Sequence, residues 1–278
     1  MRSKDVKVRK SHLNRWLGEI GPKYITSITD TDLLRVQARF QEQRSKKTGA
    51  PLANSSINKM IFAMQNFLDW AFRRQLVSHA PKIRQLSQGQ GRIRYLLPDE
   101  KDRFESVIEQ ISDPALKAFM FMAYFTGARA GELLNLTWAR LDFSTQTVLF
   151  VETKNDLGRR VPLQACWKVI EAYAKATGAR GNNEHVFLNQ RGRMPYNYAP
   201  LWAKIREKAE LEDFVFHDLR HNAASQLVMR GIDIVRVKEF MGHKTIQMTM
   251  NYAHLNPEVN LATGQALGEA LFGGSEKH

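Results

Sequence analysis

The sequence predicts a mainly helical α+β protein of two domains, with one small β-hairpin or sheet. Apolar residues recur at helical spacing through most of the chain, one segment has two β-rich runs around a turn, and a polar, glycine-containing stretch divides two such regions. With 278 residues, of which 43% are apolar, the chain is long enough for about two domains that each have a core.

Three helices are predicted in the first third of the chain. They span Val6 to Glu19, Asp30 to Gln43 after a cap at Thr29 or Asp30, and Ser55 to Arg74. In the first helix we expect Leu13, Trp16 and Leu17 to face inward. In the third, the expected core stripe consists of Ile57, Ile61, Met64, Phe67, Leu68 and Ala71. The pattern also allows a short fourth helix before Pro81.

Residues 1–88 are therefore predicted to form a helical domain, residues 89–95 a linker and residues 96–278 a second domain. The second domain should open with a helix after Leu97, because Pro98, Asp99 and Glu100 suit a first turn.

Further elements of the second domain follow from local patterns. The apolar run from Ala118 to Ala128 predicts a buried helix, and Thr147 to Leu163 predicts a hairpin with Lys154 at or near its tip. The other expected helices span Trp167 to Thr177, Tyr196 to Ala209, a segment from His217 onward, and the tail from Pro257.

The positive charge of the chain is concentrated in its first third. Residues 1–92 hold 18 Lys and Arg against 6 Asp and Glu, whereas residues 93–278 hold 23 against 22. A solvated surface without a partner would mix both signs more evenly, so this pattern favours a polyanion-binding region.

Cysteine content and hydropathy indicate the compartment. The single cysteine, Cys166, excludes an internal disulfide, and the longest apolar run is shorter than the roughly 20 residues of a membrane span. We therefore expect a cytoplasmic protein without a membrane partner.

The motif "HDLRH" from His217 to His221 has two incompatible interpretations as a site. Two histidines four residues apart with an acid between them resemble a zinc-binding helix. Against zinc, Asp218 is one methylene shorter than the glutamate of such sites, no third ligand follows at a familiar spacing, and Arg220 would bring a fixed cation beside the metal. Alternatively, His217 and Arg220 could bind a phosphate. These residues could also simply cap and pack a helix.

Two further stretches carry candidate residues. Arg129 follows a Thr-Gly break, and Glu132 stands three residues later, where its carboxylate can hold the guanidinium or form an ordinary surface ion pair. Later, Gly242 should end a helix just before His243. Thr245 can then cap another helix that contains Tyr252 about two turns in, and taken alone this tyrosine would belong to a core stripe.

Taken together, these stretches resemble the tyrosine recombinase, or phage integrase, family. The matching motifs are "TGARAGELL", a hairpin "TK" before "RRVPL", "HDLRH", "MGHK", and a tyrosine nine residues after the second histidine of the set. Each fragment is weak alone, but five in this order are specific, and the resemblance covers nearly the whole chain. The departures, Asn222, Ala223 and Met241, bear on packing.

The resemblance implies a role for each matched residue. Arg129 and Arg220 would bind the scissile phosphate, with Glu132 orienting Arg129. His217 would donate a hydrogen bond to the phosphate or act as the general base, and His243 would donate a further hydrogen bond. Lys154 would be the general acid and Tyr252 the nucleophile. The role of His221 is open.

The resemblance also implies the fold and the reaction. A helical core-binding domain and a catalytic domain would clamp double-stranded DNA, with Lys46, Lys47, Arg73 and Arg74 as candidate phosphate contacts in the first domain. Cleavage and rejoining would proceed through a 3′-phosphotyrosyl link, without metal, ATP or cofactor.

A homotetramer on DNA is expected. The tail from Pro257 would dock either on a neighbouring subunit or on its own domain. Accessory DNA-bending proteins are further expected partners. The alternatives are strand relaxation of the type IB topoisomerase kind and a non-cleaving DNA-binding accessory protein of the same fold. The target site, and the choice among integration, excision and dimer resolution, are left open.

Overall fold

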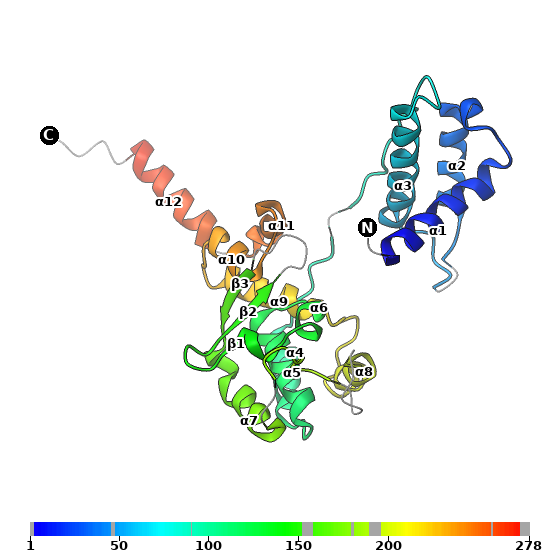
Figure 1. Ribbon diagram of the computed structural model, residues 1–278. Helices are drawn as coiled ribbons and strands as arrows, with labels where there is room; N and C mark the ends of the chain where they lie inside the picture. The colour runs from blue at the N-terminus through cyan, green and yellow to red at the C-terminus, as the bar shows by residue number, and fades with distance from the viewer. Residues whose placement is uncertain are drawn as a thin grey trace. The chain divides into compact units, whose positions relative to one another are not determined.

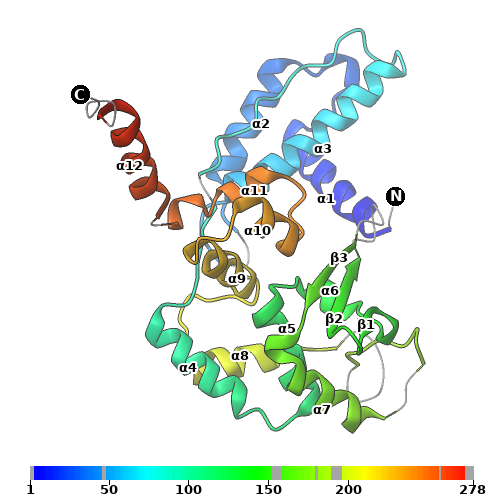
Figure 2. The same ribbon diagram turned by 90° about the vertical axis from the view of Figure 1, so that its left-hand side faces the viewer.

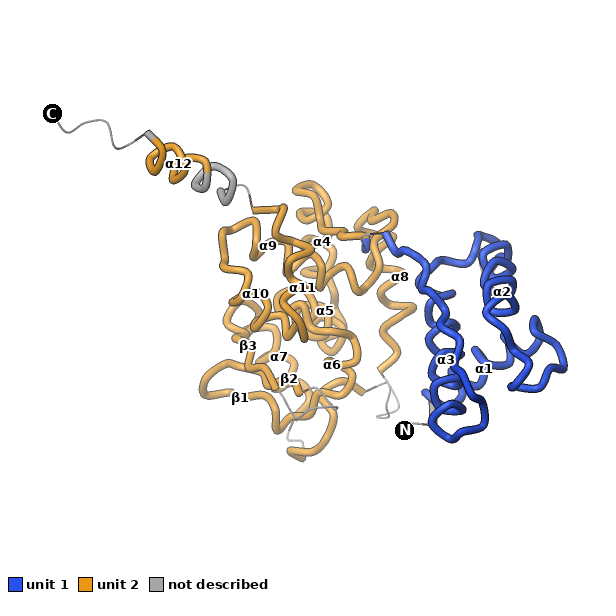
Figure 3. Tube along the Cα trace, turned by 90° about the horizontal axis from the view of Figure 1, so that it is seen from above, with its two compact units in different colours: residues 1–91 blue, residues 92–278 orange. Residues whose placement is uncertain are grey.

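The computed structural model describes most of the chain, in the ranges 3–45, 48–89, 91–151, 158–178, 181–188, 196–256 and 258–272, with no side chains described for 3, 4 and 258–263. It divides into two compact units, residues 1–91 and residues 92–278 (Figure 3). The division falls within residues 89–95, the stretch that the sequence predicts as a linker. Both units are described separately below.

Within its described residues, the first unit contains three α-helices that pack pairwise (Figure 1). They are α1 (Ser3–Ile20), α2 (Asp30–Glu42) and α3 (Asn54–Arg73). Trp16 of α1 and Phe40 of α2 meet edge to face, with 5.1 Å between ring centroids, and the Trp16 indole donates to the carbonyl of Met60 at 2.9 Å. Burial of these large side chains joins the three helices into one core.

The expected helices of this unit are present, with some differences in detail. Thr29 caps α2, and its hydroxyl accepts from the backbone N–H of Asp32. Two expectations are wrong. Leu17 is 61% exposed, because it lies about 100° around α1 from Trp16, outside the buried stripe that Trp16 shares with Ile20. Residues 74–78 form a turn and bends rather than a fourth helix, after α3 ends at Arg73.

The second unit contains nine α-helices and a small sheet within its described residues (Figures 1 and 2). The helices are α4 (Pro98–Glu109), α5 (Pro114–Thr126), α6 (Ala130–Leu134), α7 (Trp167–Thr177), α8 (Ala199–Lys208), α9 (Asp218–Met229), α10 (Ile234–Met241), α11 (Ile246–Met250) and α12 (Glu258–Phe272). The strands are β1 (Leu141–Asp142), β2 (Thr147–Val151) and β3 (Gly158–Pro162). The mainly helical α+β class is confirmed.

The apolar helix α5 is the centre of this unit, as its sequence predicts. Helices α4, α6, α7 and α9 pack around it, and its Phe119 is fully buried among aromatic rings that include Phe187 at 5.1 Å and Phe216 at 5.7 Å. Because this core surrounds α5, the C-terminal end of α5 is held firmly in place, and the candidate site begins at that end.

The three strands form one antiparallel sheet in the order β1-β2-β3. The strands of the predicted hairpin are confirmed, since β2 and β3 pair directly, with Phe150 opposite Arg159 and Val148 opposite Val161. Strand β1 was not predicted, because two residues are too short to show an alternating pattern. Lys154, predicted at the hairpin tip, lies outside the described residues.

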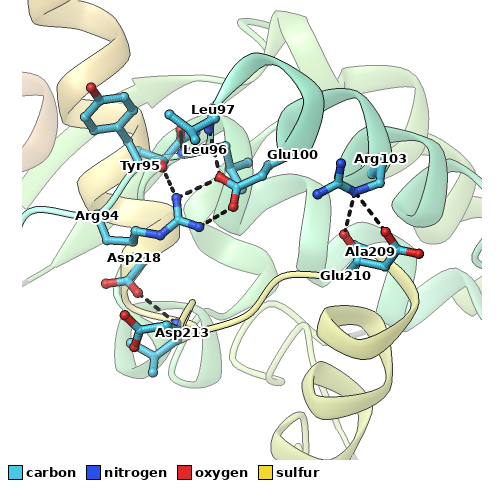
Figure 4. A network of polar contacts seen from close by, with 12 residues as sticks. Arg94, Tyr95, Leu96, Leu97, Glu100, Arg103, Ala209, Glu210, Asp213 and Asp218 are labelled. Atoms are coloured by element: carbon cyan, nitrogen blue, oxygen red, sulfur yellow. Dashed lines mark hydrogen bonds and ion pairs between the residues drawn. The ribbon is translucent and has the colours of Figure 1, made fainter.

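Polar contacts hold the start of the second unit against its helices (Figure 4). The guanidinium of Arg94 pairs with the carboxylate of Glu100, which also accepts from the backbone N–H of Leu97 at 2.9 Å. Arg94 lies over the ring of Phe214 at 5.2 Å, and Arg103 donates to the carbonyl of Ala209 at 3.2 Å. These contacts join α4 to the segment between α8 and α9.

Within the described residues, no helix combines the length and the apolar character that crossing a bilayer requires.

Candidate active site

The turn after α5 requires glycine and thereby determines where Arg129 begins. Gly127 caps α5 with a φ of +59°, a conformation that L side chains rarely adopt. A Cβ there would also lie 2.6 Å from the Cε of Met241 and 3.0 Å from the Cβ of Ala223. The bare backbone of Gly127 therefore lets the end of α5 approach α9 and α10 closely.

Arg129 and Glu132 are linked by both backbone and side chain. The N–H of Arg129 donates to one carboxylate oxygen of Glu132 at 2.7 Å, and its guanidinium donates to the other at 3.1 Å. Arg129 also donates to the carbonyl of Gly242 at 3.3 Å. The Arg129 side chain is 28% exposed, so this cation is supported by the protein and still accessible from solvent.

A second arginine, Arg159 of β3, holds the same carboxylate. Its Nη1 and Nη2 donate to the two oxygens of Glu132 at 2.7 and 2.9 Å, in a two-pronged geometry that arginine alone can make. Burial by itself would raise the pKa of Glu132, but the hydrogen bonds and charge of Arg159, with those of Arg129, lower it below the ordinary value. Glu132 is therefore ionised at neutral pH and can orient both arginines.

Arg220 of α9 is nearly completely buried, with 4% of its surface exposed. It donates to the carbonyl of Gly127 at 2.9 Å and to the carbonyl of Met241. Burial and the charges of Arg129 and Arg159 lower the pKa of Arg220 to about 9, which leaves it positive at pH 7. Because the carbonyls belong to the ends of α5 and α10, Arg220 places a fixed cation where three helices meet.

His217 immediately precedes α9 and is held there by its neighbours in sequence. The carboxylate of Asp218 accepts from the backbone N–H of Val215 at 2.8 Å and from Arg92 at 3.3 Å. The His217 side chain has no hydrogen-bond partner among the described residues. Burial and the charges of Arg220 and Arg129 lower its pKa, so it is neutral at pH 7. An uncommitted imidazole beside two arginines suits an anionic ligand.

His243 follows the glycine that ends α10, as predicted. Gly242 has a φ of +63°, and the ring of His243 is buried, with Nδ1 2.8 Å from the Oγ1 of Thr249. Burial and the charges of Arg220 and Arg129 lower the pKa of His243 to about 3, so the ring is neutral at pH 7. A neutral ring held at Nδ1 keeps Nε2 for another partner.

Tyr252 is buried, with 3% exposure, and its ring stacks on His243 with 6.2 Å between centroids and 6° between planes. Its hydroxyl lies 2.5 Å from Nδ1 of His221. Burial raises the pKa of the phenol, an effect that Arg220 opposes. The expectation that Tyr252 lies two turns into a helix is wrong, because α11 ends at Met250 and Tyr252 stands in the turn that leads into a 3-10 turn at Ala253–Leu255.

Five predicted residues thus form one connected cluster. Arg129 and Arg220 bind carbonyls of neighbouring turns, and the ring of Tyr252 stacks on that of His243. His217 joins the cluster through His221, whose ring it meets edge-on and which contacts Tyr252. No group of three His, Cys, Asp or Glu side chains with metal-binding geometry occurs among the described residues. The cluster is cationic and holds a buried phenol, a combination suited to nucleophilic attack on a phosphodiester.

Comparison with known proteins shows to which family the chain belongs. The family model described as "Phage integrase family" matches residues 94–258, which is more than half of the chain and includes the whole cluster. The chain belongs to the phage integrase family. Its curated relatives include the integrase of Salmonella phage P22, which is 28% identical over 196 residues, or 66% of this chain. That match spans 49% of the P22 protein, about half of its length.

Other proteins that resemble this chain match over more of their length. Tyrosine recombinase XerC of Bacillus pumilus is 29% identical over 246 residues, covering 80% of this chain and 78% of XerC. Among solved structures, the Tn1549 transposon integrase in complex with a circular intermediate DNA has a TM-score of 0.79 at 18% identity, covering 96% of this chain and 94% of that one. This likeness shows a shared fold.

Three residues of this family member were given no role by sequence reasoning: Arg159, His221 and Thr249. Arg159 lies two residues before the buried Val161 and therefore on the same face of β3, a spacing that predicts an inward-facing charge. His221 stands one helical turn after His217, which indicated a shared face. Nothing in the sequence indicated that Thr249 would reach His243, since that contact depends on how α11 packs.

The other predicted contacts lie elsewhere or outside the described residues. Lys154, Lys46 and Lys47 are outside them. Arg73 donates to the carbonyl of Asp69 at 3.2 Å, and Arg74 lies over the ring of Trp70 at 5.9 Å; both arginines are exposed on the first unit.

Proposed function

We propose that this chain is a site-specific DNA recombinase that cleaves and rejoins double-stranded DNA through a 3′-phosphotyrosyl intermediate. One observation carries the proposal: the buried Tyr252 belongs to a cluster that contains two arginines able to bind a phosphate. Tyr252 contacts His243 and His221, and Arg220 binds the turn that leads to His243. A phosphodiester repels nucleophiles and gains charge during displacement, so preorganised cations favour attack by a phenol.

Each residue has a defined task in this reaction. The oxygen of Tyr252 attacks phosphorus, while Arg129 and Arg220 stabilise the charge on the nonbridging oxygens. His217 and the Nε2 of His243 donate further hydrogen bonds to the phosphate. The departing 5′ oxygen receives a proton from Lys154, which the family resemblance assigns as the acid. Glu132 keeps the fork of Arg129 in place.

The phosphotyrosyl link retains the energy of a phosphodiester. A 5′ hydroxyl of another strand can attack it and release Tyr252, so rejoining needs neither ATP nor a metal ion. Exchange of strands between two duplexes requires several active sites. We therefore propose a homotetramer on DNA, with accessory DNA-bending proteins as further partners, acting in the cytoplasm on nucleoid DNA.

We assign the first unit to binding the DNA backbone. The excess of positive charge in residues 1–92 supports this role, with Lys46, Lys47, Arg73 and Arg74 as candidate contacts. Such binding weakens steeply as the salt concentration rises.

Covalent capture tests the proposal. The protein is incubated with sheared, nicked genomic DNA of the organism that encodes it, denatured in detergent, and the attached strands and peptide are identified. We expect an adduct on the Tyr252 peptide with recurring DNA ends. Tyr252→Phe should bind DNA without forming the adduct, whereas Tyr198→Phe, in the same unit, should behave as wild type.

Two results would change the assignment. An adduct that persists in Tyr252→Phe would place the nucleophile elsewhere. Cleavage that relaxes supercoiled DNA, with no strands exchanged between duplexes, would indicate a topoisomerase.

A further inference from the structure

The hydroxyl of Tyr252 makes a short hydrogen bond to a residue that neither the sequence nor the proposed function assigns. Nδ1 of His221 lies 2.5 Å from this hydroxyl, and the ring centroids are 5.9 Å apart. His221 belongs to α9 and Tyr252 to the turn after α11, 31 residues later. The contact therefore depends on tertiary packing, in which α9 lies against the 3-10 turn that begins at Ala253.

The residues around Tyr252 restrict the hydrogen-bond partners that its hydroxyl can reach. One face of the Tyr252 ring is stacked on His243, and the ring packs with Val237 and Met241 in a small apolar cluster. Among the described residues, His221 is the only side chain or backbone group that hydrogen-bonds to this hydroxyl. The position of the nucleophilic oxygen is thus determined by His221.

The protonation states of the two groups determine the direction of the hydrogen bond. Burial, then the charges of His217 and Arg220, lower the pKa of His221, while Asp218 opposes this effect. The imidazole is therefore neutral at pH 7, with one nitrogen that accepts and one that donates. Burial raises the pKa of Tyr252, so the phenol keeps its proton. The phenol accordingly donates to Nδ1, and His221 carries its own hydrogen on Nε2.

We propose that His221 holds Tyr252 through Nδ1 and accepts the phenolic proton as Tyr252 attacks the scissile phosphate. This inference rests on the proposed function and specifies the base that it needs. In the forward step the bond from Tyr252 oxygen to phosphorus forms, the bond from phosphorus to the 5′ oxygen breaks, and the phenolic proton moves to Nδ1. The 5′ oxygen takes a proton from the Lys154 ammonium. In rejoining, the 5′ oxygen bonds to phosphorus as the bond to Tyr252 breaks, the 5′ hydroxyl gives its proton to the Lys154 amine, and Nδ1 returns its proton to the departing phenolate.

His217, the other candidate base, is less suitable for this role. Its ring meets His221 at right angles, with 5.1 Å between centroids, and the described residues give its side chain no hydrogen bond to Tyr252. A division of tasks follows, in which His217 donates to the phosphate and His221 serves the nucleophile. His217 immediately precedes α9, and His221 follows one helical turn later on the same side.

The first test needs no DNA. In the free protein at pH 7.5, the nitrogen-15 chemical shifts of His221, assigned by comparison with His221→Asn, report which ring nitrogen carries hydrogen. We expect an unprotonated Nδ1 whose shift changes in Tyr252→Phe. A hydrogen on Nδ1, or a shift indifferent to Tyr252→Phe, would overturn the proposal.

The second test measures single-turnover formation of the covalent adduct on a nicked duplex that carries the DNA ends recovered by covalent capture. Removing a general base typically slows such a step by about 100-fold or more, and we expect this loss in His221→Ala with DNA affinity unchanged within twofold. His221→Asn keeps an acceptor near the position of Nδ1 but cannot take the proton, so it should recover less than a tenth of the wild-type rate. His254→Ala is the control, since His254 is an exposed histidine two residues after Tyr252.

A substrate with sulfur in place of the bridging 5′ oxygen separates the two proton transfers. A thiolate leaves without protonation, because the pKa of a thiol is only about 8.5. The defect of His221→Ala should persist on this substrate, whereas that of Lys154→Ala should be relieved. A His221→Ala rate that returns to wild type would place His221 on the leaving-group side and overturn the proposal.

The outcomes distinguish the inference from the proposed function. A wild-type chain that forms no adduct with any DNA removes both. Normal adduct formation in His221→Ala would contradict the inference and leave the proposed function standing. A full rate in His221→Asn would contradict the proton transfer, because it would show that His221 only accepts a hydrogen bond from Tyr252.

Discussion

Arg159 holds Glu132 through two parallel hydrogen bonds, of 2.7 and 2.9 Å, at a place where both side chains are at least 90% buried. The Glu132 carboxylate also binds Arg129, so one buried anion connects the strand β3 to the first arginine of the site. Four predictions follow from this pair and from the groups around it.

The first prediction concerns Arg159→Met. Removing one partner of a buried ion pair leaves an unpaired charge and commonly costs about 3 kcal/mol or more of unfolding free energy. We expect urea denaturation to show a loss of this order, and covalent adduct formation to fall at least tenfold because Glu132 no longer orients Arg129.

Arg160→Met is the matched control for this change. Arg160 is the next residue of β3, with a 55% exposed side chain that donates to Thr147. It should alter stability by less than about 1 kcal/mol, as expected for exposed ion pairs. Equal behaviour of the two variants would contradict the role given to Arg159.

The second prediction concerns Arg129→Lys and Arg220→Lys. Each variant keeps its positive charge but loses the planar fork, and Arg220 in particular binds two carbonyls that a single ammonium cannot reach in the same geometry. We expect the adduct rate to fall by about 100-fold in each, the usual effect of removing one transition-state donor. Filter binding should show nearly unchanged affinity for DNA. Arg206→Lys, on the exposed surface of α8, is the control, and near-normal cleavage in either site variant would refute their proposed role.

The third prediction concerns Gly242→Ala. A Cβ at Gly242 would lie 2.8 Å from Nη1 and 2.9 Å from Cδ of Arg159, and the residue has a φ of +63°. We expect a loss of stability of more than about 1 kcal/mol, the cost of a left-handed conformation for an L residue, together with reduced adduct formation as Arg159 shifts.

Gly21→Ala distinguishes the cost of the left-handed backbone from the effect of the contact with Arg159. Gly21 has a φ of +77° with nothing within 4 Å of its Cβ position, so this variant carries the backbone cost alone. Both proteins are compared by thermal unfolding. If Gly242→Ala loses no more stability than Gly21→Ala and cleaves normally, the close approach of Arg159 has no functional consequence.

The fourth prediction concerns pH. The pKa of His243 is lowered to about 3 in the folded protein, whereas an unfolded histidine titrates near 6.5. Below pH 6.5 the unfolded state therefore binds a proton that the folded state does not bind. This contribution to the unfolding free energy is fully present above that pH and is lost as the pH falls toward 3.

This dependence is measured by urea unfolding at pH 7 and pH 5. His217 and His221 have lowered pKa values too and contribute in the same direction. Since one pH unit of differential protonation amounts to about 1.4 kcal/mol, we expect His243→Gln to reduce the loss between these pH values by about 1–2 kcal/mol. An unchanged loss in the variant would show that His243 is readily protonated in the folded protein.

Local patterns in the sequence were sufficient for most helices. Residues such as Ile57, Ile61 and Leu68 repeat with helical spacing and are buried, and Gly242 ends α10 where its position in the sequence indicates. Helix formation and capping depend on interactions within a few residues, so they can be predicted without the fold. The exposed Leu17 shows the limit, because the buried face of α1 is decided by the helices that it meets.

The amino-acid sequence is sufficient to predict the helical class and the hairpin, and it contains the concentration of positive charge before residue 93 and the order of motifs that resembles the phage integrase family. Which side chains contact one another in the site depends on the tertiary structure. Arg159 reaches Glu132 across 27 residues, and His221 reaches Tyr252 across 31. Such contacts depend on how strands and helices pack after they have formed, and the burial that lowers histidine pKa values and raises that of the phenol arises from the same packing.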